Sequence, residues 1–376
     1  MQQHNIIVNA TAAVTGGALT ILKQFLSGIS QYGMDYHYYI FCSVEMEEYS
    51  SPNITFFKRK QKNWFQRIYW DHFGFKRRLN KEQISPSIII SFQNTSVRYN
   101  KSVVQIIYYH QPLPIVRFRW NPFRKGELML FLYRTFYPFF VSYYLLKNTI
   151  VVVQSNYIKR LFCDRYKHPL EQIYSIKPNM SKIDVSSIVP ISFNDEKIHL
   201  FYPATPLKYK NHKLLIEMLA FLKKNDPKKA AKIVLHFTCN ENTFPYMKMI
   251  DELKLNSYFK FEKELSYDKM LSFYKSVDAV LFPSYIETFG LPLIEASEFG
   301  LPIFTVDELY AHEVLKNYDG VTFLSYCKPA DWAEAISRWL DEKDKKYIHL
   351  RQKDEHPGWK DFFILIDSIV NRSKYV

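Results

Sequence analysis

The stretch LFPSYIETFGLPLIEASEFGLPIFT, residues 281–305, decides the fold of the second half of the chain. The apolar run 279–282 predicts a buried strand, and 302–305 predicts the next one. Gly290 relaxes the backbone before a helix whose first turn contains Pro292, where a missing N–H costs least. The order strand, loop, helix and strand is typical of a parallel α/β unit.

Two glutamates in this stretch can face one ligand from different heights. Glu287 lies in the loop, and Glu295 lies about one turn into the helix that begins near Leu291. The free N–H groups and the positive dipole end of that helix favour a phosphate. An ionised carboxylate matches a vicinal diol, because each oxygen can accept from one hydroxyl. The arrangement therefore suits a nucleotide sugar.

The same alternation of strands and helices extends over the whole chain and predicts two parallel sheets. Strands are expected at 5–10, 36–42, 87–92, 103–109 and 149–154 in the first half, and at 199–202, 232–237, 258–261, 279–282, 302–305 and 321–324 in the second.

The domain boundaries follow from the segments between these patterns. Residues 181–196 are polar and weakly periodic, which indicates a linker, and 359–370 predict an amphipathic closing helix. We therefore expect a first domain over 1–185 and a second over 190–356, with the helix 357–376 packing back on the first.

Residues 281–305 resemble the E-x7-E region of the family 4 retaining glycosyltransferases. The resemblance implies an α/β architecture of the GT-B type, two Rossmann-like parallel-sheet domains facing a central cleft. It implies that Glu287 binds the hydroxyls of the donor sugar and has a catalytic, stabilising role, and that Glu295 binds the ribose hydroxyls. The amides around Phe289, Gly290 and Leu291 would hold the sugar or the diphosphate.

The stretch FYPATPLKYKNH, 201–212, resembles the first strand, loop and helix of the same family's nucleotide domain. An arginine and a lysine usually hold the diphosphate there. Lys210 stands at the lysine position, but Ala204 or Thr205 stands where the arginine is usual. We expect Lys208 to substitute, because fixed cations stabilise the charge that builds up on the leaving phosphates.

In the first domain, Gly16 and Gly17 follow the opening strand and resemble the family's glycine-rich loop beside the donor phosphates. A missing Cβ allows backbone to approach a ligand closely. His110 stands at the position of the family's active-site histidine, at the carboxyl end of a strand, where open α/β sheets bind ligands. We expect it to contact the donor.

The charge of the chain is concentrated in its first half. Residues 1–190 contain 24 Lys and Arg against 10 Asp and Glu, and residues 191–376 contain 26 against 27. A basic half predicts an anionic partner. The first residues lack the pattern of a secretory signal, and the four cysteines lack metal or redox spacing, which predicts a cytoplasmic protein with reduced thiols.

Two segments of the first half combine aromatic residues with cations or long apolar runs. Residues 56–81 interleave both types, and 128–146 are apolar but interrupted by Arg134 and Pro138, so we predict no transmembrane span. Contact with an anionic membrane surface and a buried helix with a few outward aromatics remain equal alternatives.

The resemblance implies transfer of a hexose-type sugar, with retention, from a nucleotide sugar to a lipid-diphosphate or glycan acceptor in capsule, O-antigen or exopolysaccharide synthesis. No Asp-x-Asp motif occurs, so we predict no metal and no cofactor besides the co-substrate. We expect a peripheral protein of the inner membrane face that binds no nucleic acid. A sugar-nucleotide epimerase, a nicotinamide dehydrogenase and a nucleic-acid-binding module are the alternatives.

Overall fold

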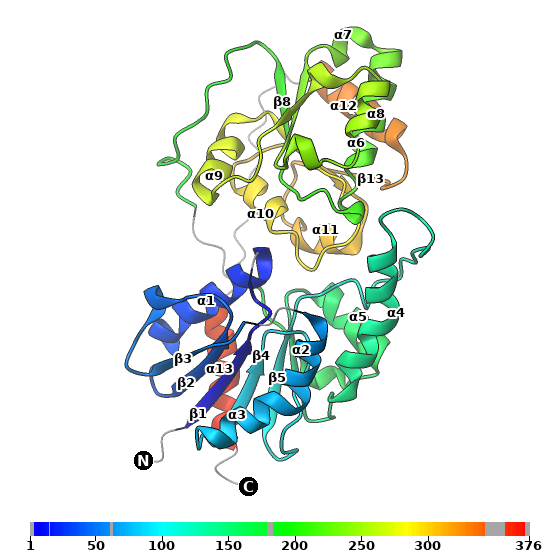
Figure 1. Cartoon of the computed structure of the whole chain (residues 1–376). Helices are drawn as coiled ribbons and strands as arrows, with labels where there is room; N and C mark the ends of the chain where they lie inside the picture. The colour runs from blue at the N-terminus through cyan, green and yellow to red at the C-terminus, as the bar shows by residue number, and fades with distance from the viewer. Residues whose placement is uncertain (1–3, 15, 61–62, 179–182, 343–357, 373–376) are drawn as a thin grey trace. The chain divides into compact units, whose positions relative to one another are not determined.

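The structure is a computed structural model that describes residues 4–14, 16–60, 63–178, 183–342 and 358–372. The chain divides into two compact units, one formed by Met1–Ser181 with Glu355–Val376 and the other by Lys182–Asp354 (Figure 1). Each unit contains one parallel sheet with helices on both faces, so the predicted α/β class is confirmed.

The sheet of the first unit has the strand order β3-β2-β1-β4-β5-β6-β7. Its strands are β1 (Asn5–Ala10), β2 (His37–Cys42), β3 (Ile54–Lys58), β4 (Ile88–Ser91), β5 (Val104–Tyr109), β6 (Ile150–Val153) and β7 (Ile173–Ser175). The sequence prediction missed β3 and β7, which form the two edges. Edge strands have one neighbour and are less buried, so they lack the continuous apolar run of a central strand.

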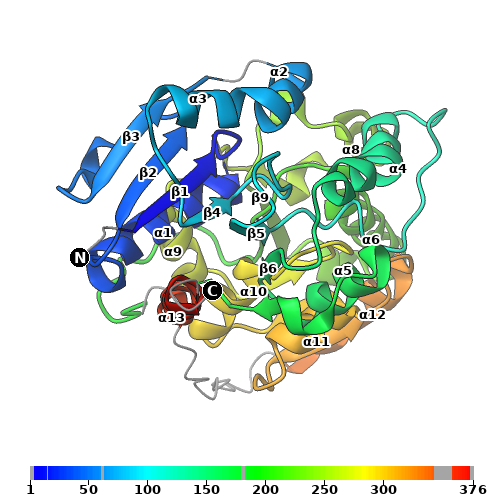
Figure 2. The ribbon, with the colours of Figure 1, turned by 90° about the horizontal axis from the view of Figure 1, so that it is seen from below.

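Side chains alternate between the two faces of this sheet. Ile6 and Val8 of β1 point into one core, whereas Ile7 points into the other. The helices α1 (Gly16–Tyr32) and α13 (Trp359–Arg372) pack together on the first face. The opposite face carries α2 (Trp64–Tyr69), the π-helical turn η2 (Trp70–Gly74) and α3 (Phe75–Lys81), as Figure 2 shows. The remaining helices of this unit are α4 (Leu128–Tyr143) and α5 (Asn156–Tyr166).

The helix α4 is half core and half surface. It buries Leu130, Tyr137, Pro138 and Val141, while Phe139 is 62% exposed. In the described part of the chain, no helix is long and apolar enough to cross a membrane. Most of the segment 128–146 is thus a helix of the first unit, α4, with several outward apolar side chains.

All six strands expected in the second half are present, in the order β10-β9-β8-β11-β12-β13. They are β8 (Ile198–Tyr202), β9 (Ile233–Phe237), β10 (Phe259–Phe261), β11 (Ala279–Phe282), β12 (Ile303–Val306) and β13 (Val321–Leu324). The helices that follow them include α6 (His212–Asn225), α7 (Pro227–Ala230), α8 (Met247–Glu252), α9 (Tyr267–Ser276), α10 (Leu291–Glu298), α11 (Leu309–Val314) and α12 (Pro329–Glu342).

The strand order of this second sheet reverses between β8 and β11. From β8 the chain passes through α6, which packs with α12, whereas from β11 it passes through α10, which packs with α9 and α11. Neighbouring helices therefore leave the carboxyl ends of two adjacent strands in different directions. Open α/β sheets bind ligands at such a reversal.

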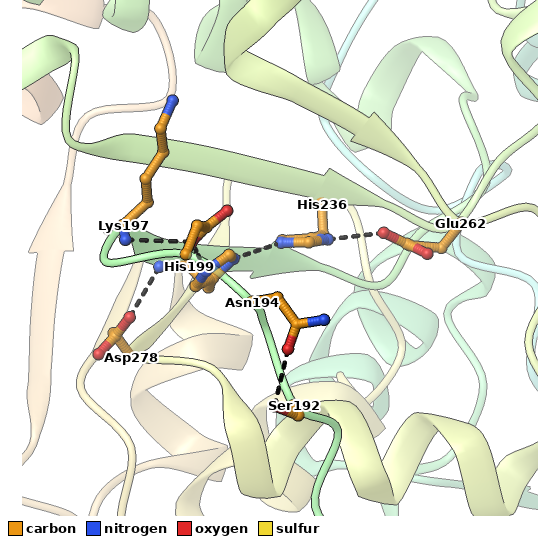
Figure 3. A network of polar contacts seen from close by, with 8 residues as sticks. Ser192, Asn194, Lys197, His199, His236, Glu262 and Asp278 are labelled. Atoms are coloured by element: carbon orange, nitrogen blue, oxygen red, sulfur yellow. Dashed lines mark hydrogen bonds and ion pairs between the residues drawn. The ribbon is translucent and has the colours of Figure 1, made fainter.

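The segment that leads into β8 is attached to the second sheet through a chain of polar contacts (Figure 3). Asp195 contacts His199 at 2.8 Å, His199 contacts His236 at 2.9 Å, and His236 contacts Glu262 at 2.7 Å. The ring of Phe193 stacks on His199 with centroids 3.8 Å apart. These contacts attach residues 193–195 to β8 and β9.

The close packing of α1 on α13 makes Gly28 a test of the first core. A Cβ at Gly28 would lie 2.6 Å from Cε2 of Phe363, whose ring stacks on Phe25 at 5.5 Å. We expect Gly28→Ala to lower the free energy of unfolding by about 1–3 kcal/mol through overpacking, although alanine favours a helix by ~1 kcal/mol over glycine.

Denaturant unfolding measures this effect. In a Phe363→Leu background the alanine should be nearly neutral, since the obstructing ring is gone. Equal destabilisation in both backgrounds would contradict the packing described for α1 and α13.

Candidate functional site

The loops that follow β8 and β11 are joined to each other at the strand-order reversal. The amide of Tyr285 donates to the carbonyl of Tyr209 at 3.1 Å. Asn211 Nδ2 donates to the carbonyl of Pro283 at 3.4 Å, and Tyr310 Oη donates to the carbonyl of Ser284 at 2.5 Å. The two loops therefore form one surface at the carboxyl edge of the sheet.

An ion pair between Lys210 and Glu287 crosses this surface. The two side chains are 77 residues apart in sequence and only 18% and 14% exposed, and Lys210 Nζ donates to Glu287 Oε1. Partial burial strengthens such a pair relative to a solvated one. The structure thus brings together the lysine and the loop glutamate that sequence analysis placed in one site.

The other basic position, Lys208, lies in the same 3-10 turn as Lys210 and is half-buried. At the place of the family's arginine, Ala204 is buried and Thr205 is exposed. Neither side chain carries a charge, so the cations of this loop are Lys208 and Lys210.

The backbone after Glu287 has a conformation that requires glycine. Gly290 caps α10 with a φ of +82°, and a Cβ there would lie 3.3 Å from Leu293 and from Tyr310. Phe289 is buried and Leu291 is half-buried, so both support the loop. In the first turn of α10, Pro292 has no N–H and the amide of Leu293 donates to the carbonyl of Gly290 at 3.0 Å. An anion at this helix start would therefore meet the amides of Gly290 and Leu291.

Glu295 is held one turn into α10 by a buried tyrosine of α9. Tyr274 Oη donates to Glu295 Oε2 at 3.0 Å. Burial raises the pKa of the Glu295 carboxyl, and the hydrogen bond from Tyr274 opposes that rise. A carboxylate has about four lone-pair sites, so one phenol donor leaves capacity for a diol.

Sequence analysis missed His212, the first residue of α6. Its ring lies among Tyr202, Phe237 and Phe244, with centroids 4.7, 4.9 and 5.6 Å away. Burial, together with the charge of Lys210, lowers the pKa of His212 to about 3. The residue is therefore neutral at pH 7 and supports the turn that carries Lys210.

In the first unit, both predicted glycines open α1. Gly16 has a φ of +59°, and an added Cβ would meet nothing within 4 Å at either Gly16 or Gly17. No packing contact of a described residue therefore requires Gly17. The open space above both glycines is what a ligand approaching the backbone needs.

His110 follows β5, and its amide donates to Asn94 Oδ1 at 2.6 Å. Burial lowers the pKa of His110 to about 4, and the nearby Arg67 charge contributes. The imidazole is neutral at pH 7, so it can exchange hydrogen bonds with a ligand but supplies no positive charge.

The interleaved cations and aromatics of residues 56–81 have a partly structural explanation. The guanidinium of Arg59 lies 4.1 Å from the ring centroid of Trp70, and that of Arg78 lies 5.2 Å from Phe57. Each cation stacks on a ring of the same segment. Outward-facing Phe65, 80% exposed, is not explained in this way.

Asp71 is the functional candidate that sequence analysis missed in the first unit. It is the only acidic residue between 56 and 81, and this isolation among cations could have singled it out from the sequence. Asp71 accepts from Asn9 Nδ2 at 3.2 Å, and Asn9 Oδ1 accepts from Trp70 Nε1 and from Gln93 Nε2. A buried polar cluster therefore stands at the carboxyl ends of β1 and β4.

Comparisons with known proteins show similarity to glycosyltransferases. Residues 187–355 match the family model described as glycosyl transferases group 1. D-inositol 3-phosphate glycosyltransferase of Corynebacterium aurimucosum is 25% identical over 142 residues, 37% of this chain and 34% of that protein. O-antigen chain mannosyltransferase RfbU of Salmonella typhimurium is 32% identical over 89 residues, 24% of this chain and 25% of that protein.

Residues 187–355, most of the second unit, are therefore similar to the glycosyl transferases of group 1. The matches span about a third or less of the length of these curated relatives.

Solved structures extend the likeness in fold to the whole chain. WaaG, a glycosyltransferase involved in lipopolysaccharide biosynthesis, has a TM-score of 0.66 at 14% identity, over 96% of this chain and 99% of that chain. HepE of Anabaena in complex with UDP-glucose has a TM-score of 0.59 at 14% identity, over 99% of both chains. The chain has the GT-B fold.

The buried His212 predicts a pH dependence of stability. Because the pKa of His212 is lower in the folded state than in the unfolded state, the folded state binds fewer protons below pH ~6.5. The free energy of unfolding therefore decreases as the pH is lowered, by up to ~1.4 kcal/mol per pH unit. We expect His212→Leu to make the decline between pH 7 and pH 5 shallower. Unfolding free energies at several pH values measure the slope, and an unchanged slope would contradict the burial of a neutral ring.

Proposed function

We propose that the chain is a retaining glycosyltransferase. It moves a hexose-type sugar from a nucleotide sugar to a lipid-linked or glycan acceptor in cell-surface polysaccharide synthesis. The observation that carries the proposal is the Lys210–Glu287 pair at the strand-order reversal of the family-matched unit, beside the first turn of α10 and Glu295. UDP-glucose in the similar HepE complex supports a nucleotide-sugar donor.

Different residues of the second unit bind different parts of the donor. The amides at the start of α10 and the cations Lys208 and Lys210 hold the diphosphate, Glu295 accepts from the ribose diol, and Glu287 accepts from the hydroxyls of the sugar. As the bond from the sugar to the phosphate breaks, negative charge grows on the diphosphate beside fixed cations. The pairing of Lys210 with Glu287 holds both groups in place before the reaction.

Retention follows in this proposal from reaction on one face of the sugar. The leaving phosphate takes the proton of the acceptor hydroxyl, so no carboxylate is needed as a covalent nucleophile. His110, neutral at pH 7, hydrogen-bonds the donor from the first unit. Cations of the chain serve the diphosphate in place of a metal ion. Among the described residues, no His, Cys, Asp or Glu cluster suited to a metal occurs.

The first unit binds the acceptor. It also binds peripherally to the cytoplasmic surface of the inner membrane face. Its excess of cations suits anionic headgroups or a lipid diphosphate. Tyr69, Phe73 and Phe139 are 51%, 52% and 62% exposed on α2, η2 and α4. Aromatic side chains beside cations are typical of proteins that lie on a bilayer surface.

Donor binding is tested by thermal unfolding with each common nucleotide sugar. One of them should raise the melting temperature by several degrees, since a ligand at 100 times its Kd adds about 2.7 kcal/mol. Glu295→Gln should weaken binding ~10-fold or more by removing a charged acceptor. The fold should tolerate this change, because ionised Glu295 is destabilised by burial. Saturating chelator should leave the shift intact.

Glu334→Gln, at an exposed position of α12, is the control and should bind like the parent protein. If no nucleotide sugar stabilises the protein, the proposal fails. Isomerisation of the bound donor without acceptor would identify an epimerase instead.

Membrane contact is tested by co-sedimentation with vesicles. Vesicles rich in anionic phospholipid should bind the protein at low salt, and binding should weaken as salt screens the charges. Phe65→Ser with Phe139→Ser should reduce binding by removing two exposed rings. Salt-dependent binding to an oligonucleotide without binding to vesicles would favour a nucleic-acid-binding protein.

A further inference from the structure

The first unit contains a cavity of about 280 Å³ that the donor site does not use. It lies between α2 with η2 on one side and α4 on the other, and the loop after β4 closes its floor. Its lining includes Arg67 and Asp71, Ser96 of the loop after β4, and aromatic side chains of α4. Its volume is close to the lower limit of about 300 Å³ for small-molecule pockets, so it suits one ring.

The floor of the cavity is polar and rigid. Asp71 accepts from Asn9 Nδ2 at 3.2 Å and from Thr95 Oγ1 at 3.4 Å. Arg67 donates to the carbonyl of Gln93 and to Tyr137 Oη. Burial raises the pKa of Asp71 to about 6, and the charge of Arg67 opposes that rise. At pH 7 the floor therefore presents an ionised carboxylate in a fixed orientation.

Ser96 is a second polar residue of the same lining. The hydroxyl of Ser96 is buried, the residue is 1% exposed, and its Oγ has no hydrogen-bond partner among the described residues. A buried hydroxyl without a partner costs about 1–3 kcal/mol. Because Ser96 belongs to the cavity lining, a rotation of its side chain would bring the hydroxyl to a ligand in the cavity and remove this cost.

The walls are aromatic. Tyr137, Phe140 and Tyr144 line the inside, and Tyr144 Oη contacts the ring of His72. Phe139 and Tyr143 also line the cavity and are 62% and 56% exposed, so they stand at its mouth. Rings present flat apolar faces of large area. A pyranose ring has apolar C–H faces, which can pack on the aromatic rings. Its equatorial hydroxyls can donate to the carboxylate at the floor.

Other occupants fit the cavity less well. The Asp71 carboxylate repels a phosphate, and the Nη2 donor of Arg67 is already engaged by Gln93 and Tyr137. An acyl chain would exclude water from the Asp71 carboxylate without donating a hydrogen bond to it, which is unfavourable for a charged group. A whole nucleotide exceeds the volume.

We propose that this cavity binds one sugar residue of the acceptor glycan, with its hydroxyls on Asp71 and Ser96 and its apolar face on the aromatic wall of α4. The assignment to an acceptor rests on the proposed glycosyltransferase function. The cavity thereby selects which glycan the enzyme extends.

The test uses the full chain and the methyl glycosides of glucose, galactose, mannose and N-acetylglucosamine, with binding measured by saturation-transfer NMR. At least one glycoside should bind. Ser96→Ala should weaken that glycoside about five-fold, as the loss of one neutral hydrogen bond predicts. The same change should leave the melting temperature equal or higher, because it removes a hydroxyl without a partner.

Asp71→Asn should weaken the glycoside at least about ten-fold, since a hydrogen bond to a charged group is lost. Ser102→Ala, at an exposed position before β5, is the matched control and should change nothing. No binding of any glycoside, or equal binding by the Ser96 and Asp71 variants and the parent, would overturn the proposal.

Thermal shifts with nucleotide sugars on the same samples separate this proposal from the donor site. Intact donor shifts with no glycoside effect would refute the cavity alone. Glycoside binding that depends on Asp71 and Ser96, without any donor shift, would support the cavity as a sugar site and refute the glycosyltransferase assignment.

Discussion

The reversal of strand order between β8 and β11 is the constraint on which the candidate site depends. Because α6 and α10 leave adjacent strands in different directions, their preceding loops meet at one edge of the sheet. The Lys210–Glu287 pair joins those loops, and the left-handed Gly290 then starts α10 beside them. A cation, a carboxylate and a helix N-terminus are thereby held together before any ligand arrives.

The sequence predicted most of this fold from local pattern. The four inner strands of the second sheet carry buried apolar runs, and Gly290 with Pro292 marks the start of α10. The edge strands β10 and β13 are only partly buried and were predicted from the alternation of strands and helices. The edge strands β3 and β7 of the first sheet were missed, because β3 is only half-buried and β7 has only three residues. Pairing across 77 residues and the burial of His212 depend on tertiary packing, which spacing alone does not encode.

The two units have different electrostatic characters that suit different partners. The second has balanced charge and concentrates its chemistry at one sheet edge. The first has an excess of cations over acidic residues, and several of its arginines stack on rings. Its buried centre combines a neutral His110 with the Asn9, Asp71 and Gln93 cluster. Asp71 was missed because, from sequence alone, a single carboxylate among many cations is expected to be a solvent-exposed charge.

The most direct measurement of the central claim is a crystal structure of the protein with a bound nucleoside diphosphate. We expect the diphosphate at the first amides of α10, within hydrogen-bonding reach of Lys210 or Lys208, and both ribose hydroxyls on Glu295. Density for the diphosphate away from the loops after β8 and β11, with Lys210 still paired to Glu287 and Glu295 untouched, would contradict that claim.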